Sequence, residues 1–168
     1  MAANTPYQPL DSTKTQIRIL DIKPGRGKDA IHVGLLVISM HEHATYEALS
    51  YTWGASTEGR SCFVNGVRIA ITNNLWRALS RLRLRFKKRR LWVDALCIDQ
   101  SNDVEKSQQV AFMSEIYAAA SLVIIWLGDP PKLPKFSVTG AWRMVSSKHF
   151  LAALQGSPEH FFLALRAL

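Results

Sequence analysis

The chain has 168 residues, of which 48% are hydrophobic and 20% charged, and its formal net charge is +8. This composition excludes a disordered protein, and no apolar run reaches the roughly 18 residues that span a membrane. Two cysteines, Cys62 and Cys97, a polar N-terminus and the lack of metal-ligand spacing predict a reduced, cytoplasmic setting without a bound metal.

The first half of the chain has the pattern of β-strands. Residues 16–25 (QIRILDIKPG) alternate in polarity up to a Pro-Gly turn, and residues 31–40 form a second strand that can pair with them. Residues 46–53 are a third extended segment. In residues 62–71 (CFVNGVRIAI), the central Asn-Gly dipeptide predicts a tight hairpin, because both turn residues must adopt a positive φ.

A helix is predicted over residues 72–86, with Thr72 or Asn73 as its N-cap. Apolar residues recur in it at helical spacing, with arginines on the other face. We expect this apolar stripe to pack on the core, and its members are Leu75, Leu79, Leu82 and Phe86.

The second half alternates buried-looking strands with a helix. Residues 91–98 and 122–127 are predicted strands, and residues 102–120 a helix that begins with a capping box of Asn102 and Glu105. Strands and helices that alternate with short connections favour a parallel sheet. We therefore predict a small three-layer α/β domain with a mainly parallel central sheet, to which the N-terminal strand pair and the hairpin are added.

The chain divides into three parts. We assign residues 1–15 to an N-terminal lead, residues 16–130 to the α/β domain, and residues 131–168 to a loop followed by helices over 137–156 and 157–168. The last helix is apolar and ends without a cap, which favours a chain shortened from something longer.

Eight basic residues and no acid occur between residues 77 and 90. Such a stretch can bind nucleic acid or an anionic membrane, or it can be the solvated face of a helix. We favour the helix face over nucleic-acid binding, because no aromatic ladder or known nucleic-acid motif accompanies the charge.

Three blocks in order resemble one protein family. They are YEALSYTWG at 46–54, LWVDALCIDQ at 91–100 and NDVEKSQQVAFMSEIYAAASLVIIWLG at 102–128. Together they closely resemble the heterokaryon incompatibility (HET) domain of filamentous fungi. Two positions depart from the family pattern, with Asp99 where the family usually has Asn and Lys106 where it usually has Arg.

The resemblance implies a signalling module of fungal non-self recognition that triggers cell death, through self-association or contact with protein partners. HET domains have been likened to TIR domains, which share a small parallel α/β fold. Some TIR domains hydrolyse NAD with a glutamate near the start of a helix. The resemblance therefore leaves open a second function, a hydrolase with NAD as its substrate.

The candidate site follows from the expected sheet, because ligands of open α/β sheets bind beyond the carboxyl ends of the strands. Glu105, in the first turn of its helix, is the candidate catalytic carboxylate, and Asp99 is a weaker one. Glu105 can equally serve only as a helix cap. Polar and aromatic side chains expected to contact a ligand are Ser50, Tyr51, Trp53, Gly54, Gln100 and Asn102.

Asp94 differs from these residues, because it lies inside the apolar run 91–98. A buried carboxylate needs hydrogen-bond partners. We therefore predict that Asp94 is a structural anchor, bonded to the segment 46–54 or to the loop after it.

Overall fold

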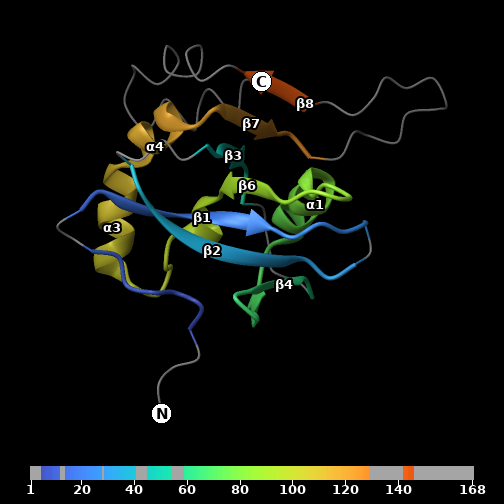
Figure 1. Ribbon diagram of the computed structural model, residues 1–168, viewed down its shortest axis with the longest axis horizontal. Coiled ribbons are helices and arrows are strands. Elements are labelled where there is room, and N and C mark those ends of the chain that lie inside the picture. Colours follow the sequence, from blue (N-terminus) through green and yellow to red (C-terminus); the bar gives the residue numbers. More distant parts are fainter. Residues whose placement is uncertain are drawn as a thin grey trace.

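The computed structural model describes residues 5–11, 14–27, 29–40, 45–53 and 59–128, and the backbone of 142–145. In these parts of the chain, eight strands form one sheet and four helices lie beside it (Figure 1). The strands are β1 (Gln16–Ile22), β2 (His32–Ser39), β3 (Glu47–Tyr51), β4 (Ser61–Val64), β5 (Val67–Ala70), β6 (Arg89–Trp92), β7 (Leu122–Trp126) and β8 (Trp142–Val145). The helices are α1 (Asn73–Leu82), α2 (Asp94–Cys97), α3 (Asp103–Ala111) and α4 (Met113–Ala119).

The sheet is mixed, with the strand order β5-β4-β2-β1-β6-β3-β7-β8. β3 is parallel to both β6 and β7, and β2 is parallel to β4, whereas the other neighbours are antiparallel. The α/β class is confirmed, and the expected central strands β6, β3 and β7 are parallel, but the sheet as a whole is mixed instead of mainly parallel. β1 is not an addition to the sheet, because it lies in its interior between β2 and β6 and buries four consecutive residues, 17–20. The three-layer arrangement stays a prediction.

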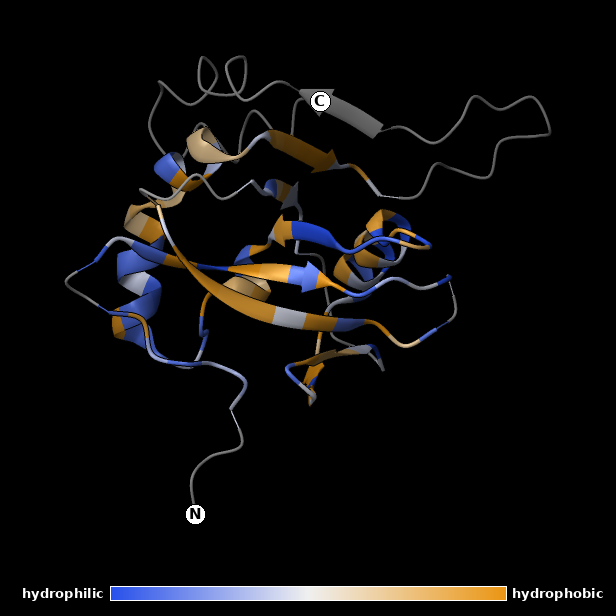
Figure 2. Ribbon diagram, viewed as in Figure 1, coloured by the Kyte–Doolittle hydropathy of each residue, from blue (hydrophilic) through white to orange (hydrophobic). Residues whose placement is uncertain are grey.

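The parallel strands β6, β3 and β7 give the sheet two distinct edges. Ala48 of β3 is opposite both Trp92 of β6 and Val123 of β7, and all three strands run in the same direction. Their carboxyl ends therefore lie at one edge of the sheet and their amino ends at the other. β7 is hydrophobic over most of its length (Figure 2), as expected for a strand in the core.

The N-terminal strand pair and the hairpin are confirmed. β1 and β2 are antiparallel neighbours, from Gln16 opposite Ser39 to Ile22 opposite Val33. β4 and β5 pair across the turn formed by Asn65 and Gly66, whose φ angles are 49° and 85°. The positive φ values required by the Asn-Gly turn are present.

The first helix is shorter than predicted. Thr72 caps α1 by accepting a hydrogen bond from the backbone N–H of Leu75 at 3.2 Å, but the helix ends at Leu82 instead of residue 86. The chain leaves the helix at Arg83, whose buried guanidinium donates to the carbonyl oxygens of Ala30 at 2.9 Å and Asp29 at 3.1 Å, and also to that of Arg26. Phe86 therefore lies outside the core, with 78% of its surface exposed.

The basic stretch 77–90 is consequently not one helix face. Only Arg77 and Arg81 belong to the exposed side of α1, and the remaining basic residues lie on the connection to β6 or on β6 itself. The prediction of a single solvated helix face is wrong, because α1 ends before most of these residues.

The prediction of a strand over residues 91–98 is also wrong for the second half of this segment. β6 ends at Trp92, and residues 94–97 form the single turn α2, closed by hydrogen bonds from Cys97 N to Val93 O at 2.8 Å and from Ile98 N to Asp94 O at 3.2 Å. A short apolar run has no periodicity that separates a strand from a buried helical turn.

The helix predicted over 102–120 consists of two helices that meet at Phe112. Asn102 caps α3 as expected, because its Oδ1 accepts from the N–H of Glu105 at 3.1 Å. α3 buries its polar residues Glu105 and Gln109, while its apolar residue Val110 is exposed. Polar bonds to β1, such as Gln109 Nε2 to Gln16 O at 2.9 Å, explain this orientation of α3.

The helix expected over 137–156 is contradicted at residues 142–145, which form β8. This strand is antiparallel to β7, whose free edge offers backbone groups that a short segment can pair with. The rest of that helix, and the one predicted over 157–168, lie outside the described residues. None of the helices within the described ranges has the length and apolar character needed to cross a membrane.

Candidate functional site

Asp94 occupies the carboxyl edge of the parallel strands, directly after β6. Its Oδ2 accepts a hydrogen bond from the indole Nε1 of Trp53 at 2.8 Å, and its Oδ1 accepts from the backbone N–H of Ala95 at 2.7 Å. The Tyr51 hydroxyl also hydrogen-bonds to this carboxylate. The contact expected between Asp94 and the segment 46–54 is present in the structure, with β3 and the residues after it supplying the donors.

The electrostatics of Asp94 follow from its position. Burial raises the pKa of the Asp94 carboxyl above its usual value, and the donors from Trp53, Ala95 and Tyr51 oppose this by stabilising the charged form. Burial raises the pKa of the Tyr51 hydroxyl, and the neighbouring Asp94 carboxylate raises it further. The result is a tyrosine that keeps its proton near neutral pH, beside a carboxylate with three fixed donors.

A second set of polar contacts joins the neighbouring elements at this edge. Asn74 of α1 donates from Nδ2 to the carbonyl oxygen of Thr52 at 2.7 Å, and its Oδ1 accepts from Trp126 Nε1 at 2.7 Å. Asn74 thereby links α1 to the ends of β3 and β7. Sequence reasoning missed this residue, although a buried indole N–H usually needs an acceptor and Trp126 lies in a core strand.

The other predicted ligand-binding residues are dispersed. Ser50 is buried and hydrogen-bonds to the Tyr117 hydroxyl, which also donates to Leu49 O at 3.2 Å. Gln100 donates from Nε2 to the backbone carbonyl of Asp94 at 3.1 Å, so it lies beside the cluster. Gly54 lies outside the described residues. Tyr51, Trp53 and Gln100 are thus gathered around Asp94, while Ser50 and Asn102 are engaged in the core and in the cap of α3.

Glu105 lies apart from this cluster, in a buried ion pair with Arg18 of β1. Arg18 Nη1 is 2.5 Å from Glu105 Oε1, and Arg18 Nη2 is 2.9 Å from Oε2. The Asp99 N–H also donates to Oε1, at 2.9 Å. Exposed fractions are 1% for Arg18 and 8% for Glu105. Both carboxylate oxygens of Glu105 are therefore occupied by donors inside the protein.

The surroundings of Arg18 complete this buried group. Its guanidinium also donates to the carbonyl oxygens of Cys97 at 3.2 Å and Gln8 at 2.5 Å, and it lies 5.2 Å from the ring centroid of Tyr7. Sequence reasoning missed Arg18, because strict alternation along β1 places it on a polar face. Four consecutive buried residues show instead that both faces of β1 are covered.

The second candidate carboxylate, Asp99, shapes the turn before α3. Its Oδ1 accepts from the N–H of Ser101 at 3.0 Å and from the Ser101 hydroxyl at 2.6 Å. Lys106, at the second position that departs from the family pattern, pairs with Asp103 on the surface at 2.7 Å.

The side chains near this edge differ in how well they suit a nucleophile, a metal ligand and a surface for an aromatic ring. Burial raises the pKa of both Cys62 and Cys97 to about 12, which keeps these thiols protonated near neutral pH. Within the described ranges, no three His, Cys, Asp or Glu side chains are grouped so as to hold a metal ion. Trp53 is 48% exposed, and its indole face can stack on an aromatic ring while its N–H stays bonded to Asp94.

Comparisons with known proteins identify the family. The model of the heterokaryon incompatibility protein (HET) family matches residues 46–156. The curated "Heterokaryon incompatibility protein 6, OR allele" of Neurospora crassa is 32% identical over 133 residues, an alignment that covers 71% of this chain. No solved structure matches the chain. The chain belongs to the HET family, and the matched part spans 20% of the length of that curated relative.

Proposed function

We propose that this chain is a module of heterokaryon incompatibility, the non-self recognition of filamentous fungi, and that it acts by protein contacts that lead to cell death. The match of the HET family over residues 46–156 carries this proposal, and the name of the Neurospora crassa relative agrees with it. Contact with partner proteins or with further copies of the chain is the mode of action that the geometry around Glu105 favours.

The alternative is a hydrolase of NAD or a related nucleotide, centred on Glu105. A carboxylate that stabilises positive charge on a sugar needs an oxygen directed at the ligand. Glu105 instead points both oxygens at Arg18, and one of them also accepts from Asp99 N–H. This arrangement supports a structural role for Glu105, and for that reason we rank the contact function first.

Inducible expression in a filamentous fungus tests the contact function. We expect growth arrest and uptake of a vital dye after induction. We expect the same response from Trp53→Leu, which removes the stacking face and the hydrogen bond to Asp94 but no core side chain. A chain that accumulates to the same level without any arrest would contradict the proposal.

Purified protein separates the two functions. We expect no release of nicotinamide when the concentrated chain is incubated with NAD. If the wild-type chain releases nicotinamide and Trp53→Leu does not, the hydrolase is the better assignment and the contact function is contradicted. The same Trp53→Leu protein in the fungal assay then shows whether that chemistry is needed for arrest.

A further inference from the structure

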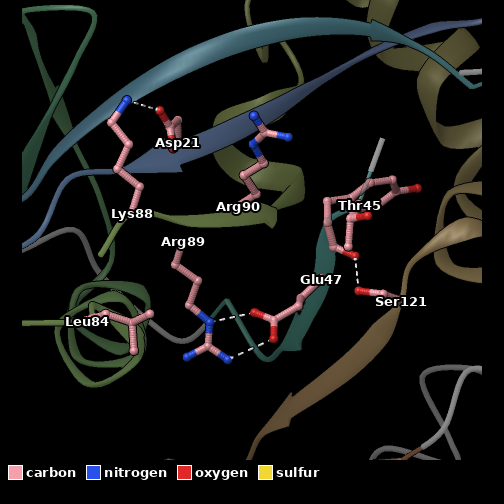
Figure 3. Close-up of a pocket in the computed structure, with 9 residues that line it drawn as sticks. Asp21, Thr45, Glu47, Leu84, Lys88, Arg89, Arg90 and Ser121 are labelled. Carbon is pink, nitrogen blue, oxygen red and sulfur yellow. Dashed lines mark hydrogen bonds and ion pairs between the residues drawn. The ribbon is translucent and has the colours of Figure 1, made fainter. Parts of the chain in front are cut away.

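An open pocket of about 590 Å³ lies at the amino edge of the parallel strands, the edge opposite to Asp94 (Figure 3). It is formed where β3 and β6 begin, where β1 ends, and by the residues next to β7 and before β6. We call it the amino-edge pocket, and its principal lining residues are Asp21, Glu47, Leu84, Lys88, Arg89 and Arg90.

Two of the three basic side chains in the amino-edge pocket are already paired. Lys88 Nζ is 2.7 Å from Asp21 Oδ2, and Arg89 donates to both oxygens of Glu47, at 2.5 and 3.2 Å. Arg90 is different, since no hydrogen bond or ion pair joins its side chain to another residue in the part of the chain that the structure describes. Its guanidinium therefore keeps its planar set of donors for a ligand.

Apolar surface lies on the connection that precedes β6. Leu84 lies on the side of Arg89, and the guanidinium of Arg90 points away from it (Figure 3). Leu84 lines the pocket with 40% of its surface exposed, and Phe86 follows two residues later on the same connection with 78% exposed. The guanidinium carbon of Arg85 lies 4.7 Å from the centroid of the Phe86 ring. An exposed aromatic ring beside arginines is typical of the anchor residues of protein interfaces.

We propose that the amino-edge pocket binds an acidic peptide segment of a partner protein. A carboxylate of the peptide binds the guanidinium of Arg90, and an apolar side chain of the peptide packs on Leu84 and Phe86. This inference names the partner surface for the proposed contact function, and so rests on it.

The charges decide between the occupants of this surface. A formal net charge of +8 attracts an acidic partner and repels a second copy of the chain. A nucleic acid presents phosphates throughout, and the carboxylates of Asp21 and Glu47 in the pocket oppose such a continuous anion. A peptide that combines isolated carboxylates with apolar residues fits both the charges and the exposed leucine and phenylalanine.

Selection from a random peptide display library on the immobilised chain tests the proposal. We expect the enriched peptides to contain Asp or Glu next to an apolar residue. In fluorescence anisotropy, we expect Arg90→Glu to weaken binding of an enriched peptide by about tenfold or more, because a charged hydrogen bond is lost. The matched control is Arg68→Glu, which makes the same charge change on β5, the strand at one end of the sheet, separated from β6 by β4, β2 and β1.

Three results would overturn this inference. The first is that the enriched peptides lack acidic residues, or that the wild-type chain enriches peptides no more strongly than the Arg90→Glu variant does. The second is equal weakening by Arg90→Glu and Arg68→Glu, which would reduce the binding to net charge. The third is that the chain binds duplex DNA more tightly than it binds the peptide, and that Arg90→Glu weakens this DNA binding. Because these assays use purified protein, they also succeed or fail independently of growth arrest in the fungus.

Discussion

At the scale of single residues, the Arg18 guanidinium poses the strictest requirement on its neighbours, since it is 1% exposed in the interior of the sheet. A buried charge is tolerated only when it is paired and hydrogen-bonded. Glu105 supplies the opposite charge, and the carbonyl oxygens of Gln8 and Cys97 accept from the remaining donors. This ion pair, together with the hydrogen bond from Gln109 to Gln16, holds α3 against β1.

We expect Glu105→Ala to lower the free energy of unfolding by about 3–5 kcal/mol, because it leaves the Arg18 charge buried without a partner. The double variant Arg18→Leu/Glu105→Leu should recover a large part of this loss, since it removes both charges. Denaturant unfolding followed by circular dichroism measures these differences. Glu115→Ala, an exposed glutamate on α4, is the matched control and should change stability by less than about 0.5 kcal/mol. An equal effect of the two glutamate variants would contradict the structural role of the pair.

Asp94 makes folding depend on pH. Because burial raises the pKa of this carboxyl in the folded protein, the folded state holds the proton more tightly than the unfolded state does. The contribution of Asp94 to stability is therefore greatest below the unfolded pKa, about 3.9, and decreases as pH rises through the folded pKa.

Asp94→Asn should remove this pH dependence while its side-chain oxygen still accepts from Trp53. We expect the variant to gain stability relative to the wild type as pH increases from about 4 to about 8. Unfolding free energies measured at several pH values provide the test. A difference between the two proteins that stays constant with pH would show that the Asp94 carboxyl is not perturbed as described.

At the scale of secondary-structure elements, the connection from α1 to β6 separates residues that the sequence pattern groups together. Leu79 lies on the core-facing side of α1 and is fully buried. Phe86, seven positions later in the same predicted stripe, lies beyond the end of the helix and is exposed. The two residues should therefore respond differently to the loss of their side chains.

We expect Leu79→Ala to cost about 2–5 kcal/mol of stability, and Phe86→Ser to change it by less than about 0.5 kcal/mol. Thermal and denaturant unfolding of the two purified variants measures both effects. A large loss in Phe86→Ser would mean that the residue packs against the core after all.

Much of the element order follows from local patterns. The strand pair β1 and β2, the Asn-Gly turn at Asn65, and the caps Thr72 and Asn102 are all encoded within a few residues, and the structure contains them. The turn α2 could not be predicted in this way, because buried helical and extended segments share the same apolar composition.

In the candidate site, too, features that follow from the local sequence context could be predicted, whereas features that follow from the strand order could not. A polar partner for Asp94 was predictable from its apolar sequence context alone, and the bond to Trp53 fulfils it. The pairing of Glu105 with Arg18 joins residues 87 positions apart, and it depends on β1 lying inside the sheet. No local pattern reports that position, so the buried partner of Glu105 could not be foreseen.

At the scale of the whole molecule, the N-terminal residues hold the middle of the sheet. The Tyr7 ring and the Gln8 carbonyl contact Arg18, and the Pro6 carbonyl accepts from Asn65 Nδ2 at 3.0 Å. The segment 5–11 therefore connects the buried ion pair to the hairpin, two regions that belong to distant parts of the chain.

Deletion of residues 1–11 should destabilise the protein by about 1.5–3 kcal/mol, the usual range for a lost hydrogen bond to a charged group. Gln8→Ala is the control, because Arg18 binds the backbone carbonyl of Gln8, and this substitution should be nearly neutral. Hydrogen exchange of β1 amides, compared among the three proteins, reports whether the loss centres on Arg18. Unchanged exchange in the deleted chain would show that the segment does not support the sheet.

The strand order also determines how a growing chain can fold. β1, β2, β4 and β5 each have at least one sheet partner among themselves, and only β1 of the four also pairs with β6. In contrast, β3, which precedes β4 in the chain, pairs only with β6 and β7. During synthesis, the apolar strand β3 therefore has no sheet neighbour until the ribosome has produced Trp92, and its second neighbour is complete only at Trp126. Unpaired strands of this kind are the segments through which nascent chains aggregate or bind chaperones.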